Sequence, residues 1–188
     1  MNKALKEAIE YSPVIAAIKD DAGLTACLNT DISIVFILYG DIITISDIVK
    51  KVHDAGKTAF VHMDLIHGLQ SKEISVDFIH KYTVADGIIS TKAPMITRAK
   101  ELGLYTVMRF FVIDSMALDN IEKHLNTTKP DIIEVLPGPM PKVVQRIVSL
   151  TKRPVIAGGL VSDKEDVLAL LDAGAACISS SSTHVWSL

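Results

Sequence analysis

Short apolar runs, many of them rich in β-branched residues, alternate with longer segments of helical periodicity along the whole chain. Several runs are continuously apolar, which is typical of parallel strands buried on both faces. The runs are residues 14–18 (VIAAI), 33–38 (SIVFIL), 58–63 (TAFVHM), 87–90 (GIIS), 104–108 (LYTVM), 131–136 (DIIEVL), 154–157 (PVIA) and 176–179 (ACIS). We therefore predict eight parallel strands.

The segments between these runs carry the start and stop signals of helices. TISDIVKKVHDAG and APMITRAKELG end at Gly56 and Gly103, and glycine commonly ends a helix. The clearest start is the sequence SDKE at 162–165, which reads as a capping box formed by Ser162 and Glu165. The helix that it opens is predicted to stop at Gly174.

Strands and helices that alternate at this spacing form parallel βαβ units. Eight such units in series predict an α/β fold, a compact single-domain (β/α)8 barrel of the TIM type over residues 1–188. The chain is shorter than the roughly 250 residues typical of that fold. A doubly wound open sheet is the structural alternative. No segment resembles a linker, so a second domain is not expected.

The composition agrees with one globular domain, since 49% of the 188 residues are hydrophobic and 22% are charged. A formal net charge of −3 argues against nucleic-acid binding driven by charge over the whole surface. The sequence shows neither an export signal nor an apolar run near the roughly 18 residues of a membrane span. Only two cysteines occur, Cys27 and Cys177, which suits reduced thiols in a cytoplasmic protein.

The last two strands end in glycine and serine. In a (β/α)8 barrel, phosphate groups commonly bind at the loops after strands seven and eight. The residues at these ends, named here the glycine–serine cluster, are Gly158, Gly159, Ser179, Ser180 and Ser181. Their backbone N–H groups and hydroxyls are suited to an anion, so the cluster is a predicted phosphate site. The alternative is a plain turn followed by a stop of small residues.

Polar and charged residues occupy the ends of four other strands. These strand-end polar residues are Asp64, Ser90, Lys92, Arg109 and Glu134. Burying such groups unpaired is costly, so they either pair with one another or bind a ligand. In a ligand site, Lys92 and Arg109 suit anionic oxygens, while Asp64 and Glu134 accept hydrogen bonds from hydroxyls. That combination is suited to a polyol phosphate, with a structural ion-pair network as the alternative.

Two further patterns concern metal and polyanion binding. His62, Asp64 and His67 invite a metal site, but their spacing matches no dedicated metal motif, so neither a metal nor a cofactor is predicted. Residues 137–162 contain no Asp or Glu. The same region contains a basic segment, defined by Lys142, Arg146, Lys152 and Arg153. A solvated helix face and a polyanion-binding patch are its two interpretations.

Several strings together resemble the glycerol uptake operon antiterminator family. They are LYGDI (38–42), VHMDLIHGL (61–69), DGIISTK (86–92), IDSMAL (113–118), PDIIEVLPG (130–138), IAGGL (156–160) and SSSSTHVW (179–186). The similarity extends from about Val14 to Trp186. It implies a non-enzymatic regulator with a barrel fold that binds glycerol 3-phosphate. It also implies action on leader mRNA that lets transcription pass a terminator. A homodimer is a possible active form that the sequence leaves open.

On this resemblance, the glycine–serine cluster would hold the phosphate and the strand-end polar residues would face the hydroxyls. The basic segment is then the expected contact with RNA. The residues themselves leave an enzyme open as the alternative. This would be a phosphosugar isomerase or a Schiff-base aldolase, with Lys92 as the amine nucleophile and Glu134 or Asp64 as acid or base.

Overall fold

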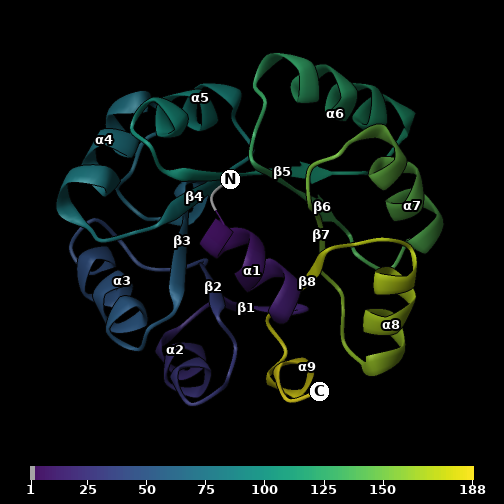
Figure 1. The fold of residues 1–188 in the computed structure, drawn as a ribbon. Coiled ribbons are helices and arrows are strands. Elements are labelled where there is room, and N and C mark those ends of the chain that lie inside the picture. Colours follow the sequence, from purple (N-terminus) through teal and green to yellow (C-terminus); the bar gives the residue numbers. More distant parts are fainter. Residues whose placement is uncertain (1–2) are drawn as a thin grey trace.

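The computed structural model describes residues 3–188, whose strands close into a barrel (Figure 1). Within this range the strands are β1 (Val14–Ile18), β2 (Ile34–Ile37), β3 (Thr58–His62), β4 (Gly87–Ser90), β5 (Tyr105–Phe111), β6 (Ile132–Leu136), β7 (Val155–Gly158) and β8 (Cys177–Ser180). All neighbours pair in parallel, and β1 also pairs with β8, with Val14 opposite Ile178. The (β/α)8 barrel is therefore confirmed. The doubly wound alternative is wrong, because an open sheet would leave β1 and β8 apart.

The helices that follow the strands form a ring around the barrel (Figure 1). They are α2 (Asp21–Leu28), α3 (Ile45–Asp54), α4 (Glu73–Tyr82), α5 (Ala93–Glu101), α6 (Ser115–Thr127), α7 (Pro141–Leu150), α8 (Lys164–Asp172) and α9 (Thr183–Trp186). A 3-10 helix, η1 (Met63–Leu65), follows β3. Gly56 and Gly103 adopt φ of +73° and +79° just after α3 and α5, as the stop signals predict. No helix within residues 3–188 is long and apolar enough to cross a membrane.

The start of α8 differs from the predicted capping box by one residue. The N-cap is Asp163, whose carboxylate accepts a hydrogen bond from the Asp166 N–H at 2.9 Å. Asp166 in turn accepts the N–H of Ser162 at 3.2 Å. A carboxylate is the stronger acceptor for the N–H groups of a first turn, so Asp163 takes the place predicted for Ser162. The box of Ser162 with Glu165 is therefore wrong, whereas the predicted helix is present.

Helix α1 (Lys3–Tyr11) is an addition to the predicted elements. Figure 1 shows it lying across one end of the barrel. Its Leu5 and Ile9 are buried in the same apolar cluster as the residues that fill the barrel interior. Phe36 and Phe60 belong to this interior cluster and meet edge to face at 5.7 Å between ring centroids. Helix α1 therefore closes the barrel interior at this end.

Both cysteines are buried thiols without a disulfide bond. Burial raises the pKa of the Cys27 thiol, and it raises the pKa of Cys177 to about 12. The Cys177 thiol donates to the carbonyl oxygens of Ile9 at 3.4 Å and Ser12 at 3.3 Å. Cys177 therefore links β8 to helix α1, a structural role that agrees with the prediction of reduced thiols.

Candidate functional site

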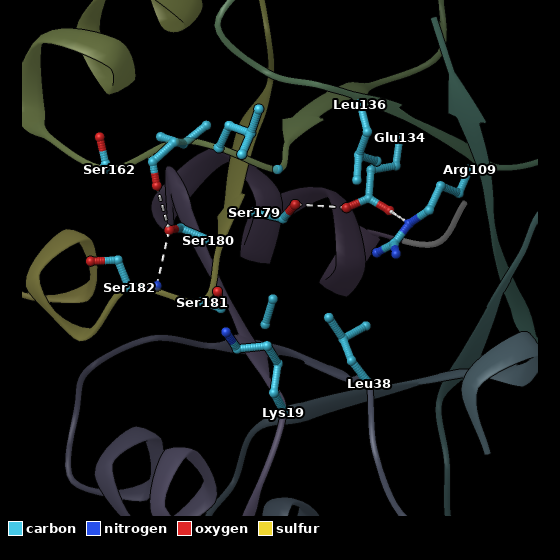
Figure 2. Close-up of a pocket in the computed structure, with 14 residues that line it drawn as sticks. Lys19, Leu38, Arg109, Glu134, Leu136, Ser162, Ser179, Ser180, Ser181 and Ser182 are labelled. Atoms are coloured by element: carbon cyan, nitrogen blue, oxygen red, sulfur yellow. Dashed lines mark hydrogen bonds and ion pairs between the residues drawn. The ribbon is translucent and has the colours of Figure 1, made fainter. Parts of the chain in front are cut away.

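A cavity of about 680 Å³ opens at the C-terminal ends of the strands. Its wall is formed by residues 159–162 after β7, residues 179–182 of β8 and the following loop, and the ends of β1, β2, β5 and β6 (Figure 2). This is the end of a (β/α)8 barrel where ligands bind, and the loops after strands seven and eight are the common phosphate site. The cavity is therefore the candidate site.

A buried ion pair forms the floor of this cavity. Arg109 on β5 lies opposite Glu134 on β6, and Arg109 Nε donates to Glu134 Oε2 at 2.6 Å. Ser179 Oγ on β8 donates to the other oxygen, Glu134 Oε1, at 2.6 Å. The side chain of Arg109 is 8% exposed and that of Glu134 is 0% exposed. In Figure 2 the terminal nitrogens of Arg109 are directed toward the cavity, while its Nε is held by Glu134.

Gly158 lies beneath this floor and does not line the cavity. A Cβ at residue 158 would collide with Ser179 Oγ and would lie 3.0 Å from Glu134 Oε1. Position 158 therefore lacks a side chain because the hydrogen bond from Ser179 to Glu134 passes over it. Gly159 does line the cavity, with φ of +72°, which favours glycine.

The serines of the glycine–serine cluster have different partners. Ser179 is bound to Glu134, and Ser180 Oγ donates to the Val161 carbonyl at 2.9 Å, which ties the end of β8 to the loop after β7. Ser181 is exposed at the cavity, and its hydroxyl has no hydrogen-bond partner within residues 3–188. Ser182, which the cluster does not include, also lines the cavity (Figure 2). Two serines of the cluster are thus engaged within the protein, and Ser181 is left exposed at the cavity.

Asp64, Ser90 and Lys92 form a separate group at the ends of β3 and β4, and none of them lines the cavity. Ser90 Oγ lies 3.2 Å from each carboxylate oxygen of Asp64, and the Thr91 N–H donates to Asp64 Oδ2 at 2.8 Å. Lys92 Nζ is 3.7 Å from Asp64 Oδ1 and contacts the Ser71 hydroxyl. The structure therefore brings Arg109 and Glu134 to the cavity and brings the other three strand-end polar residues to one another.

The three residues considered for a metal site have different surroundings. Asp64 is directed to Thr91 and Ser90, His67 is exposed, and His62 is buried at the end of β3. His62 is 3% exposed, and its Nδ1 has no hydrogen-bond partner in the described part of the chain. Burial, reinforced by the positive charge of Arg109 and opposed by Asp64, lowers the pKa of His62 from 6.5 to about 4. His62 is therefore neutral at physiological pH.

The folded protein should lose stability through His62 as the pH falls from 6.5 to about 4. In this window the unfolded chain binds a proton on His62 and the folded protein does not, so a lower pH favours unfolding. The full loss is at most about 3 to 4 kcal/mol, at roughly 1.4 kcal/mol per pKa unit. Urea unfolding at pH 7 and pH 4.5 should show a smaller loss for His62→Gln than for the wild type. The exposed His53→Gln serves as control, and equal losses in all three proteins would contradict the assignment.

Lys19 is a cavity residue that sequence reasoning missed. It follows β1, is exposed, and lines both this cavity and a neighbouring hollow of about 550 Å³. In the sequence it reads as an ordinary strand end before Asp20, which caps α2. Its place at the cavity depends on closure of the barrel, which brings β1 beside β8. Lys19 could have been found only from the topology, because in a closed barrel the end of the first strand lies next to the end of the last strand.

The basic segment lies on a different part of the molecule. Lys142 and Arg146 are exposed on α7, which Figure 1 shows on the outside of the barrel, and Lys152 and Arg153 follow that helix. None of the four lines the cavity. A polyanion bound by these residues would therefore occupy a surface separate from the candidate ligand site.

Comparison with known proteins gives concordant matches over nearly the whole chain. Residues 14–186 match the family described as glycerol-3-phosphate responsive antiterminator. The chain is 44% identical over 180 residues to the uncharacterized protein YgcP of Escherichia coli (strain K12), covering 96% of this chain and 94% of that protein.

Two crystal structures are also similar to this chain. A glycerol uptake operon antiterminator regulatory protein from Listeria monocytogenes str. 4b F2365 is 32% identical, with a TM-score of 0.89 over 93% of this chain and 94% of that one. A glycerol uptake operon antiterminator-related protein from Thermotoga maritima MSB8 is 36% identical, with a TM-score of 0.84 over 94% and 99%. The resemblance seen in the sequence motifs is confirmed.

Proposed function

Because the chain belongs to the family of glycerol-3-phosphate responsive antiterminators, we propose that it binds glycerol 3-phosphate in the barrel cavity and then acts on leader mRNA. The observation that carries this proposal is the cavity floor. Arg109 is held at Nε by Glu134, which directs its terminal nitrogens toward the space above (Figure 2). A guanidinium held in this way donates several hydrogen bonds in a defined plane to anionic or hydroxyl oxygens.

The phosphate is proposed to bind at the loops after β7 and β8, with the hydroxyls of the ligand facing Arg109. Gly158, Ser179 and Ser180 are engaged within the protein, which supports a position further out than the glycine–serine cluster. Gly159, Ser181 and the added Ser182 line the cavity, where they offer backbone groups and the exposed Ser181 hydroxyl. Such groups suit the acceptor oxygens of a phosphate.

The surroundings of Lys92 and Glu134, two of the residues that the enzyme alternative would use, support a regulatory role. A Schiff-base enzyme needs a lysine amine that faces its substrate. Lys92 instead contacts Asp64 and Ser71 outside the cavity. Glu134 accepts hydrogen bonds from Arg109 and Ser179 on its two oxygens, so it is engaged as a structural acceptor. Binding without turnover is the role that this arrangement favours.

The basic segment is the proposed contact with RNA. Lys142 and Arg146 are four residues apart on α7 and share one face of the helix. Helix α7 follows β6, which carries Glu134, and precedes β7, which leads into the cavity loop at 159–162. Through this connection, a ligand bound in the cavity can favour one position of helix α7 over another. Coupling also requires that the state competent for RNA binds the ligand more tightly.

RNA binding should depend on both the ligand and this helix face. Saturating glycerol 3-phosphate is expected to tighten binding to a glycerol-operon leader RNA by roughly 5- to 150-fold, the usual range of allosteric coupling. The double variant Lys142→Glu, Arg146→Glu should bind this RNA about tenfold or more weakly at physiological salt, because two phosphate contacts become repulsive. A filter-binding or fluorescence-anisotropy titration measures both effects.

The control for this experiment is Lys123→Glu, which reverses an exposed charge on α6. It should bind the leader RNA like the wild type. Equal RNA affinity with and without glycerol 3-phosphate would contradict the proposed sensing. Unchanged RNA affinity in the double variant would remove the basic segment as the contact.

A further inference from the structure

The position of Lys19 beside the serines follows from the register of the closed barrel. Strand β1 pairs with β8, with Ala16 opposite Ser180, so Lys19 lies next to the residues that follow β8. In Figure 2 the Lys19 side chain extends toward Ser181, and both residues line the cavity. Lys19, Ser181 and Ser182 therefore form one edge of the cavity.

The charge of the cavity comes from this lysine. On the floor, the charge of Arg109 is balanced by Glu134. Lys19 has no salt-bridge partner within the described residues, although two carboxylates follow it in the chain. Asp20 is directed to the Gly23 N–H at 2.7 Å, and Asp21 accepts the Tyr39 hydroxyl at 2.8 Å. The cavity is thus left with an ammonium whose charge is available to an anion.

We propose that Lys19 is the specificity-determining residue of this cavity and selects a phosphomonoester dianion, an inference that rests on the proposed function. A phosphomonoester carries a charge of about −1.5 to −2 at neutral pH and has three strong acceptor oxygens. Lys19 Nζ and the Ser181 hydroxyl meet that group from one edge, which the backbone of Ser182 continues. A free polyol lacks the charge, and a phosphodiester carries only one charge and has fewer terminal oxygens.

This geometry also orients the ligand. The phosphate lies at the edge formed by Lys19, Ser181 and Ser182, and the polyol extends toward Arg109 on the floor. Both ends of the ligand then meet a cation, but only the Lys19 end lacks a neutralising carboxylate in the described part of the chain. The preferred ligand class is therefore a short polyol that carries a terminal phosphomonoester.

Isothermal titration calorimetry with glycerol 3-phosphate and with inorganic phosphate tests this inference. Lys19→Met should weaken binding of both probes by about tenfold or more, because one charge-assisted contact is lost. Lys19→Arg should retain most of the affinity. Lys51→Met removes an exposed lysine on α3 and should bind both probes within about twofold of the wild type. Because Lys19 is exposed, the thermal midpoint of the variant should match that of the wild type.

The outcomes separate this inference from the proposed function. If Lys19→Met binds both probes as the wild type does, the role of Lys19 is overturned and the proposed function remains. If phosphate binding depends on Lys19 but glycerol 3-phosphate binds no more tightly than phosphate, the role of Lys19 stands and the proposed effector fails. If the wild type binds neither probe, both are overturned.

Discussion

Replacing Glu134 with alanine should destabilise the protein by about 3–5 kcal/mol, because it leaves a buried positive charge without its partner. Arg109 is 8% exposed, and its one protein hydrogen bond found within residues 3–188 goes to Glu134 at 2.6 Å. The substitution also deprives Ser179 Oγ of its acceptor. Urea unfolding followed by far-UV circular dichroism measures the loss.

The double variant Arg109→Met, Glu134→Leu is the matched control for this substitution. Buried ion pairs replaced by apolar residues of similar volume often give proteins as stable as the original. We therefore expect the double variant to regain most of the stability that Glu134→Ala loses. A double variant as unstable as the single one would show that the cost comes from lost packing and not from the unpaired charge.

Gly158→Ala is the second substitution with a large expected effect, about 2–4 kcal/mol of destabilisation. Overpacking a tight site costs about 1–3 kcal/mol, and a buried acceptor that loses its donor costs a similar amount. The added Cβ would displace Ser179 Oγ, so the Glu134 carboxylate would lose this hydrogen bond. Urea unfolding again measures the loss.

Two comparisons identify the cause of that loss. Gly23→Ala, in helix α2, should cost much less than Gly158→Ala, because its nearest contact, Asp20 Oδ1 at 3.3 Å, needs to shift by only a few tenths of an ångström and alanine favours a helix. In a protein that already carries Ser179→Ala, adding Gly158→Ala should lower the free energy of unfolding much less than it does in the wild type, because the hydroxyl that blocks the Cβ is gone. Strict additivity of the two changes would contradict the proposed cause.

The barrel could be predicted because its strands carry the pattern that burial on both faces requires. Runs such as VIAAI at 14–18 and GIIS at 87–90 coincide with β1 and β4, since continuous apolar character leaves few alternatives to a parallel strand. Arg109 and Glu134 also stand out in the sequence. A charge within an otherwise apolar strand needs a partner or a ligand, and this is visible without knowing which it has.

The partners of individual side chains could not be predicted, because they depend on distances between elements remote in sequence. Asp64 and Ser90 are separated by 26 residues and meet only because the ends of β3 and β4 are adjacent. The sequence suggests a ligand contact at Gly158, whereas in the structure the absence of a side chain there leaves room for the hydrogen bond from Ser179 on β8 to Glu134 on β6. Lys19 was missed because its role depends on the barrel closing.

The central claim is that the cavity senses glycerol 3-phosphate through Arg109, and one calorimetric titration tests it most directly. The wild type and the double variant Arg109→Met, Glu134→Leu are each titrated with glycerol 3-phosphate and with glycerol. We predict that the wild type binds glycerol 3-phosphate at least about tenfold more tightly than glycerol, and that the folded double variant binds glycerol 3-phosphate about tenfold or more weakly than the wild type, because the ligand hydroxyls lose their contact with Arg109. Equal or absent binding of both compounds by the wild type, or an unchanged affinity of the double variant for glycerol 3-phosphate, would contradict the claim.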